Sequence, residues 1–199
     1  MSDLKEQLCT KEKDSLEKLY RKVKGYAALH NIRLGACEST KKEARVDWIA
    51  SAMERKEILQ ALISDLRAGE SACLGYVYES GGFGEYIRIE PYWKETGLIY
   101  TVTDHEGFEH GVMTDVLMDF LRNDDANFLS QIRTSSFINS TVCAMTNLYG
   151  AVPYAKAYDI FQEITVMHQN VAYETFVETA TRFAEFREEC GVVPYQKNF

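Results

Sequence analysis

Proline is scarce in this chain, and its cysteines form no pattern. Three prolines and twelve glycines in 199 residues provide little of the turn chemistry of an all-β protein, so they favour long helices. The five cysteines are odd in number and include no Cys-x-x-Cys pair, which argues against a disulfide framework. We therefore expect free thiols in a reducing compartment.

Long apolar runs are also missing. No stretch approaches the roughly 18–20 apolar residues that a membrane-spanning helix needs. The first five residues, Met1 to Lys5, lack the apolar stretch of a signal peptide. We therefore expect a cytoplasmic protein with no membrane partner.

Motifs of catalysis and of cofactor binding are absent as well. Residues 81–84, Gly-Gly-Phe-Gly, are not followed by the Lys-Ser/Thr of a phosphate-binding loop and predict a hinge or tight turn. His105 and His110 are five positions apart, not four as in His-Glu-x-x-His, and no third ligand is evident. We expect no cofactor and no metal, and we lean against an enzyme. Because any two of the 30 carboxylates could meet in the fold, an enzyme without a legible motif stays open.

Apolar residues make up 46% of the chain, enough for a packed core, and their spacing predicts mostly helices. Amphipathic patterns predict helices over 12–30 and 40–53, the second beginning with a capping box, Thr40 to Glu43. Helical spacing resumes over 58–66, is broken by Gly69, and returns over 72–78.

The period then changes to that of strands. Residues 98–102 and 108–113 predict a β-hairpin around the turn residues Glu106-Gly107, with Thr103 opposite His110. Thr114 is expected to cap a helix through Leu121. The fold class is therefore mainly α with one β-hairpin: a helical N-terminal module, a winged-helix-like middle and a helical C-terminal part.

The polar stretch Arg122 to Asp125 predicts a boundary between domains at 1–122 and 123–199. Beyond it we expect helices at 126–133 and 136–148, and one with Pro153 in its first turn. A long final helix is predicted from its cap at Asn170 to Glu189.

The net charge of −8 is unevenly spread. Residues 1–45 hold 11 Lys/Arg and 7 Asp/Glu, a net charge of +4, whereas residues 46–199 hold 11 and 23, a net charge of −12. An acidic body repels nucleic acid, so contact with nucleic acid would be weak and confined to the basic N-terminal segment.

This segment, residues 12–55, resembles the helix–extended loop–helix modules of SAP and Rho-N-terminal type. The resemblance is carried by the Leu34-Gly35 turn and by a helix opening with Lys41-Lys42-Glu43, although Ala44 stands where those modules usually have leucine. It implies phosphate contacts by the basic side chains of both helices and the loop. These are Lys18, Arg21, Lys22, Lys24, Arg33, Lys41, Lys42 and Arg45.

The last predicted helix has the sharpest pattern. One side carries an apolar stripe that includes Phe176, Ala180 and Phe183, and the other carries a row of carboxylates roughly 22 Å long. On that side only Arg182 is near enough to offset several of these charges. The predicted partner-binding row consists of Glu174, Glu178, Glu185, Glu188 and Glu189.

The preferred interpretation is a non-enzymatic acidic protein that occupies a basic surface of a protein partner, for example to inhibit a nucleic-acid-handling enzyme. In general character it resembles the small acidic proteins of phages and mobile elements, including anti-CRISPR proteins. The alternative is a nucleic-acid-associated regulator that binds through the basic N-terminal module.

Overall fold

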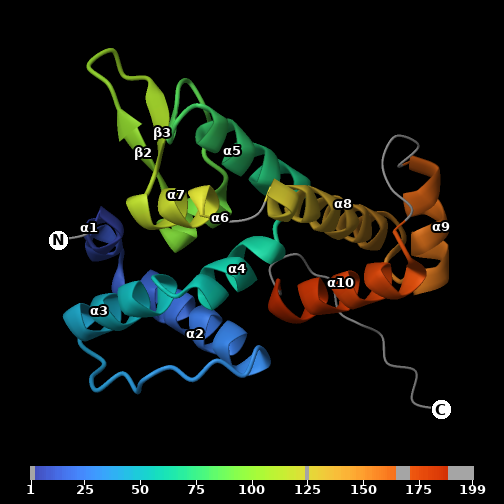
Figure 1. Ribbon diagram of the computed structural model, residues 1–199, viewed down its shortest axis with the longest axis horizontal. Helices are drawn as coiled ribbons and strands as arrows, with labels where there is room; N and C mark the ends of the chain where they lie inside the picture. The colour runs from blue at the N-terminus through green and yellow to red at the C-terminus, as the bar shows by residue number, and fades with distance from the viewer. Residues whose placement is uncertain (1–2, 124–125, 165–170, 188–199) are drawn as a thin grey trace. The chain divides into compact units, whose positions relative to one another are not determined.

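The computed structural model describes residues 3–123, 126–164 and 171–187. The fold is mainly helical with a small antiparallel sheet, which confirms the predicted fold class (Figure 1). Contacts divide the chain into two compact units. The first unit comprises residues 1–63 and 69–126, and the second comprises 64–68 and 127–199. The second unit thus includes residues 64–68, which the sequence-based boundary places in the first domain.

The elements of the first unit run from α1 to α7. They are α1 Asp3–Thr10, α2 Lys13–Leu29, α3 Lys42–Met53, α4 Lys56–Ser64, α5 Ala68–Glu79, β1 Phe83–Gly84, α6 Pro91–Thr96, β2 Ile99–Thr103, β3 Glu109–Met113 and α7 Asp115–Arg122. The second unit contains α8 Ala126–Tyr149, α9 Tyr154–Ile164 and α10 Tyr173–Phe186. Residues 64–68 cover the end of α4, the connection and the first residue of α5.

The N-terminal helices bury the predicted stripe. Leu16, Leu19 and Val23 of α2 lie in the core, as the amphipathic spacing over 12–30 predicted. Helix α1 was not predicted, although Leu4 and Leu8 are fully buried. A single i,i+4 pair in an eight-residue helix is too short a repeat to stand out from the sequence.

Two predicted helix boundaries are wrong. The capping box at Thr40 does not form, because α3 begins at Lys42 and the N-cap residue Lys41 makes no side-chain cap bond. Instead the hydroxyl of Ser39 accepts a hydrogen bond from the Lys41 N–H at 3.1 Å. Gly69 does not break a helix but lies in the first turn of α5, where the backbone N–H groups have no partner within the helix in any case.

The hairpin is confirmed, but its register differs from the prediction. The strand order is β1-β3-β2, and Val102 pairs with His110 while Thr103 pairs with Glu109. The connection is longer than the predicted turn because the Asp104 carboxylate closes it: Oδ1 accepts hydrogen bonds from the N–H groups of Glu106 and Phe108, both at 2.9 Å. Strand β1 has only two residues and was not predicted.

Helix α7 begins where the sequence placed it, but its cap differs. Thr114 occupies the N-cap position without a side-chain cap bond. Its hydroxyl donates to the Leu98 carbonyl at 3.2 Å, and its N–H donates to the same oxygen at 2.9 Å. Thr114 therefore ties the start of α7 to the residue before β2.

In the second unit α8 is one continuous helix, not the two that the sequence predicted. The Ser/Thr-rich stretch at the predicted break donates back into the helix: Thr134 Oγ1 to the Ser130 carbonyl at 3.1 Å, and Ser136 Oγ to the Arg133 carbonyl at 2.8 Å. These side chains satisfy their own polar groups without interrupting the helix.

A compact apolar core joins the three helices of the second unit. It includes Ile138 of α8, Phe161 of α9, and Phe176 and Phe183 of α10. Helix α10 begins at Tyr173 with Ala172 as N-cap, so the predicted start at Asn170 is wrong. Asn170 itself and the predicted end at Glu189 lie outside the described residues.

The segment from α4 to α5 is fixed within the second unit by buried polar groups. Asp65 is fully buried, and its Oδ1 accepts a bond from Arg182 Nε at 2.8 Å. The Asp65 carbonyl accepts a bond from Arg187 Nη1 at 3.0 Å, and the Leu66 carbonyl accepts one from Asn139 Nδ2 at 2.9 Å. Residues 64–68 are therefore anchored by side chains from α8, α10 and the residue after α10.

Candidate binding surfaces

The acidic row of α10 lies on the solvent-facing side of the helix. Glu174, Glu178 and Glu185 are exposed, while Phe176 and Phe183 on the opposite side are fully buried. Glu188 and Glu189, the other two predicted members, lie outside the described residues. The name acidic row is used below for the three described residues.

No cation in the part of the chain that the structure describes neutralises the carboxylates of the acidic row. Over the described ranges, no ion pair involves any of the three. Arg182 was the one cation expected to offset them, but its guanidinium bonds to the buried Asp65 at 2.8 Å. The negative charge of the row is therefore available to a partner.

A hollow of about 380 Å³ with both hydroxyl and apolar groups in its lining lies between α8 and the start of α10. Hydroxyl groups of Thr134, Ser135, Thr175 and Thr179 contribute to its lining. Thr175 and Thr179 directly follow two members of the row in sequence, so neutral hydrogen-bonding groups border the charged ones. No sequence pattern pointed to this hollow, because its residues come from distant parts of the chain.

Half of the eight predicted phosphate-binding residues have partners within the protein. Arg21 Nε and Arg45 Nε lie 3.3 and 3.2 Å from carboxylate oxygens of Glu17. Lys22 Nζ is 3.6 Å from Glu95 Oε1. Lys24 and Arg45 both lie over the ring of Tyr20, and the Arg45 guanidinium is 3.7 Å from its centroid. These contacts reduce the positive charge that nucleic acid would meet.

The other four cations, Lys18, Arg33, Lys41 and Lys42, have no ion pair within the described chain. The connection between α2 and α3 contains neither helix nor strand. It is tied to α3 by a bond from Trp48 Nε1 to the Gly35 carbonyl, and Arg55 Nη1 bonds the Arg33 carbonyl at 2.6 Å. A helix–connection–helix arrangement with four available cations is thus present.

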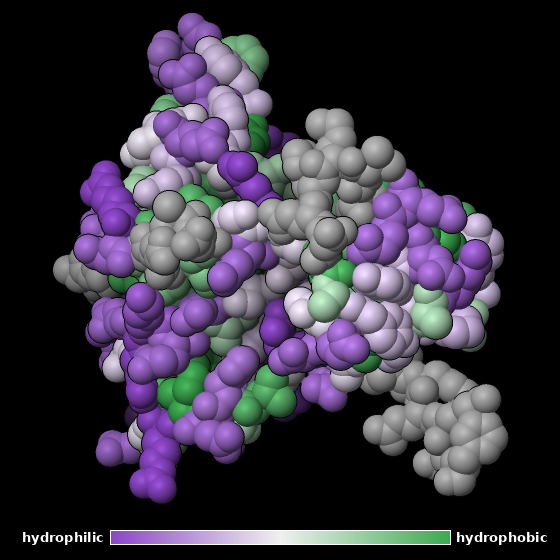
Figure 2. All heavy atoms as spheres, turned by 45° about the vertical axis from the view of Figure 1, so that its right-hand side comes forward, coloured by the Kyte–Doolittle hydropathy of each residue, from purple (hydrophilic) through white to green (hydrophobic). Residues whose placement is uncertain are grey.

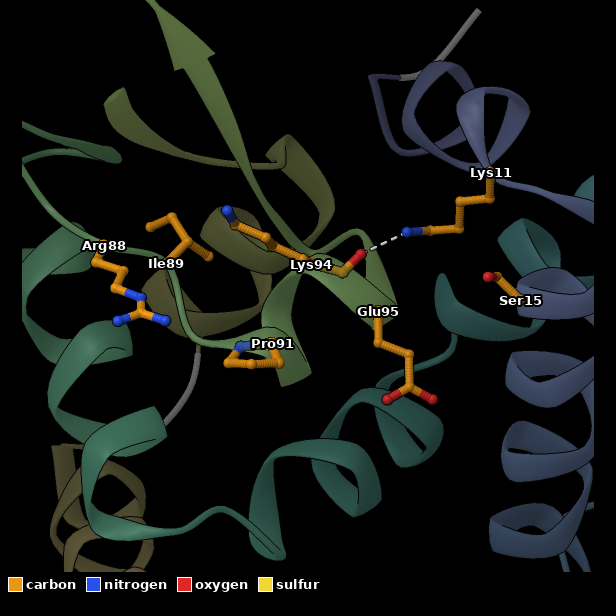
Figure 3. A pocket seen from close by; sticks show the side chains of 7 residues that line it. All are labelled: Lys11, Ser15, Arg88, Ile89, Pro91, Lys94 and Glu95. Atoms are coloured by element: carbon orange, nitrogen blue, oxygen red, sulfur yellow. Dashed lines mark hydrogen bonds between the residues drawn. The ribbon is translucent and has the colours of Figure 1, made fainter. Parts of the chain in front are cut away.

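A second hollow, of about 430 Å³, lies in the first unit and is drawn in Figure 3. Lys11, Arg88 and Lys94 line it together with Ser15 and Glu95. The Lys11 amine donates to the Lys94 carbonyl, and burial lowers the pKa of Lys11. Figure 3 shows the amine of Lys94 pointing away from that of Lys11, with Arg88 on the far side. The three cations do not converge, so the hollow is not built to bind one anion.

The two hairpin histidines have different surroundings. Because His110 pairs with Val102, its ring turns toward Asp104, and Nε2 lies 3.0 Å from Asp104 Oδ2. The side chain of His105 is exposed and lies 3.8 Å from Glu106. Within the described ranges no group of three His, Cys, Asp or Glu side chains is placed to bind a metal ion.

The chain matches no protein-family model, no curated protein and no solved structure. The resemblance of residues 12–55 to SAP-type modules, the winged-helix-like middle and the anti-CRISPR-like character therefore stay predictions. Among the residues that the structure describes, no helix combines the length and the apolar character needed to cross a membrane.

Proposed function

We propose that the protein is a non-enzymatic binding protein whose acidic row occupies a basic surface of a protein partner. The observation that carries this proposal is that no cation among the described residues neutralises the row: Glu174, Glu178 and Glu185 are exposed and Arg182 is bonded to Asp65. A basic groove that normally receives nucleic acid is the surface that such a row complements, so the partner class is a nucleic-acid-handling enzyme and the effect is inhibition.

The electrostatics support binding over a purely structural role. Glu174 and Glu178 are an i,i+4 pair of like charges, which costs a helix a few tenths of a kcal/mol. Glu174, in the first turn of α10, also interacts favourably with the helix dipole, so the row as a whole adds little to stability. Its exposed charge instead steers a basic partner into contact and increases the association rate. The described members lie along one side of a helix whose other side is buried, so they can change without disturbing the core.

The test compares two triple variants with equal net charge. One reverses the row by Glu174→Lys, Glu178→Lys and Glu185→Lys. The control reverses three exposed carboxylates of the first unit by Glu12→Lys, Glu38→Lys and Glu43→Lys. Each is used as bait, next to the unmodified protein, in a lysate of the source cell.

We expect the row variant alone to lose its captured protein, and the captured protein to elute from the unmodified bait as salt rises. The partner should then show a slower association rate with the row variant. Equal capture by all three baits, or equal loss from both variants, would refute the proposal.

The alternative function, nucleic-acid binding through the N-terminal module, is favoured by four cations of that module that form no ion pair with any described residue. If it holds, the protein shifts duplex DNA at physiological salt with sub-micromolar affinity. Replacing Lys18, Lys41 and Lys42 by Gln then weakens binding and lowers its salt dependence. Arg21→Gln serves as the matched control, because Arg21 already pairs with Glu17.

A further inference from the structure

The two faces of the three-stranded sheet differ. On one face, Gly84 and Gly111 allow neighbouring side chains to lie against the backbone: a Cβ at Gly111 would overlap Ile89, and one at Gly84 would lie 3.0 Å from Val77. Residues directly opposite across the strands share a face. The other face therefore carries Phe83, which pairs with Val112, and His110, which pairs with Val102.

That second face ends in a cluster of four aromatic rings. Phe83 stacks on His110 with centroids 5.1 Å apart, Tyr86 lies 5.4 Å from His110, and Phe108 lies 5.3 Å from Tyr86. His110 is buried in the middle, but Phe83, Tyr86 and Phe108 are 44, 68 and 48% exposed. These four residues are called the ring cluster. Contiguous exposed rings of this kind mark interaction sites more often than isolated ones do.

The ring cluster is fixed in place before anything binds. The Asp104 carboxylate closes the loop before Phe108 and also bonds the His110 ring at 3.0 Å. Tyr86 has a φ of 52°, an uncommon conformation for a residue with a side chain, which persists only where its surroundings impose it. The Tyr76 hydroxyl donates a hydrogen bond to the carbonyl of Glu85, the residue before Tyr86, at 3.2 Å. Preorganised rings lose little entropy on binding.

The charge around the ring cluster selects its ligand. Residues 80–87 and 99–113, which supply the rings, contain four carboxylates and no Lys or Arg. Three of these carboxylates, Glu85, Asp104 and Glu106, belong to the turns and loop beside the rings. Glu109 lies two positions from Gly111 in β3 and therefore on the opposite face of the sheet. Lys94 Nζ lies 3.8 Å from Glu109, and the exposed Arg88 follows Ile87 directly in the sequence. Such a surface repels phosphate groups, and a second copy of the same face would bring like charges together.

We propose that the ring cluster binds an arginine side chain of a basic protein segment. Aromatic ring faces are electronegative and attract cations, and the planar, weakly hydrated guanidinium of arginine stacks on them better than the ammonium of lysine. Glu85 and Glu106 then add charge complementarity around the stacked guanidinium. Figures 1 and 2 show the β2–β3 end of the first unit extending beyond that unit's helices, with hydrophobic side chains beside hydrophilic ones. A peptide can therefore reach it.

The experiment is a titration of the full ¹⁵N-labelled chain, followed by amide chemical shifts, with three probes. They are a capped octa-arginine peptide, the matching octa-lysine peptide, and an oligothymidine. Under the proposed function a basic peptide also binds the acidic row, so the titrations are repeated in the Glu174→Lys, Glu178→Lys, Glu185→Lys variant. Hairpin shifts that persist in this background belong to the ring cluster whether or not the proposed function of the row holds.

We expect octa-arginine to shift the amides of residues 83–86 and 104–110 and to bind several-fold more tightly than octa-lysine. The double variant Tyr86→Ala, Phe108→Ala should bind the arginine peptide at least about fivefold more weakly. The control Tyr149→Ala removes an equally exposed ring (67%) from the second unit and should leave the affinity unchanged. Glu85→Gln with Glu106→Gln keeps the rings and should lower the salt dependence of binding.

Three results would overturn the proposal. The first is equal affinity for the arginine and lysine peptides, which would mean charge attraction alone. The second is unchanged affinity in a Tyr86→Ala, Phe108→Ala variant whose amide spectrum shows an intact fold. The third is tighter binding of oligothymidine at the same amides, which would make the rings a platform for nucleic-acid bases.

Discussion

The N-terminal helices of the first unit and α10 of the second unit use charge in opposite ways. On α2 and α3, Arg21 and Arg45 share Glu17, so cations that look available from the sequence are engaged within the protein. On α10, Arg182 is engaged with a buried group, and no cation among the described residues pairs with the exposed carboxylates. Net charge along a sequence therefore does not measure the charge that a partner meets. What matters is which groups lack internal partners.

The largest expected effect is on the ion pair that removes Arg182 from the acidic row. Asp65→Ala takes away the buried partner of Arg182 and should lower the free energy of unfolding by about 3–5 kcal/mol. Urea unfolding at neutral pH measures it, with the exposed Glu57→Ala as control. A loss below about 1 kcal/mol would mean that Asp65 does not fix Arg182, and the contrast between the two units would weaken.

The core side of α10 should respond about as strongly. Phe183→Ala leaves a cavity in the core of the second unit and should cost about 3–5 kcal/mol. Thermal or urea unfolding followed by circular dichroism would report it. A near-zero change in stability would mean that this side of α10 is not part of the core. The assignment of the opposite side as the exposed, partner-binding side would then lose its basis.

A moderate effect is expected where the hairpin lies against Ile89. Gly111→Ala introduces a Cβ that overlaps Ile89, so the strand or the isoleucine has to move, at a cost of about 1–3 kcal/mol. Gly35→Ala is the matched control because a Cβ there meets nothing within 4 Å. If both variants unfold at the same denaturant concentration, the close packing of this sheet face is not required.

The hairpin loop should loosen in acid. The bond from His110, helped by the backbone N–H groups of Phe108 and Glu106, holds the pKa of Asp104 below its usual value of 3.8. A carboxyl group whose pKa is lower in the folded than in the unfolded state stabilises the folded protein at pH values above its unfolded-state pKa. This stabilisation is lost as the pH falls through the folded-state pKa. Hydrogen-exchange protection of the Glu106 and Phe108 amides should therefore drop below about pH 4. In the Asp104→Asn variant, protection of these two amides should be low at both pH 5 and pH 3. If the variant still loses protection between pH 5 and pH 3 as the unmodified protein does, a group other than Asp104 is responsible.

The smallest effect should come from the acidic row itself. Reversing its three charges to Lys should leave stability within about 0.5 kcal/mol for each substitution, because exposed positions tolerate change. Differential scanning calorimetry of the variant is the measurement. A much larger loss would show that the carboxylates are structural and would remove the difference between α10 and the N-terminal helices.

The sequence predicted those features of the fold that repeat over a whole element. Helix α2 and the two strands of the hairpin follow from apolar periodicity, as does the burial of Phe176 and Phe183 opposite the acidic row. What it missed depends on single side chains. The register of the hairpin is set by the Asp104 carboxylate, which no periodic pattern reveals.

Features assembled from distant residues could not be predicted either. The ring cluster joins Phe83 and Tyr86 to the hairpin through a strand of two residues, too short to leave a pattern. The commitment of Arg182 to Asp65 spans 117 positions of sequence. The row of glutamates on one side of a helix was legible, but whether a cation neutralised it was not.

Because of the segment from Ser64 to Ala68, the second unit is not one continuous stretch of the sequence. Because this segment belongs to the second unit while its flanking residues belong to the first, the chain passes from one unit to the other three times. A gene fragment encoding residues 127–199 alone would lack Asp65, the buried acceptor of Arg182. A contiguous segment that carries the whole second unit, residues 64–199, would also carry residues 69–126 of the first.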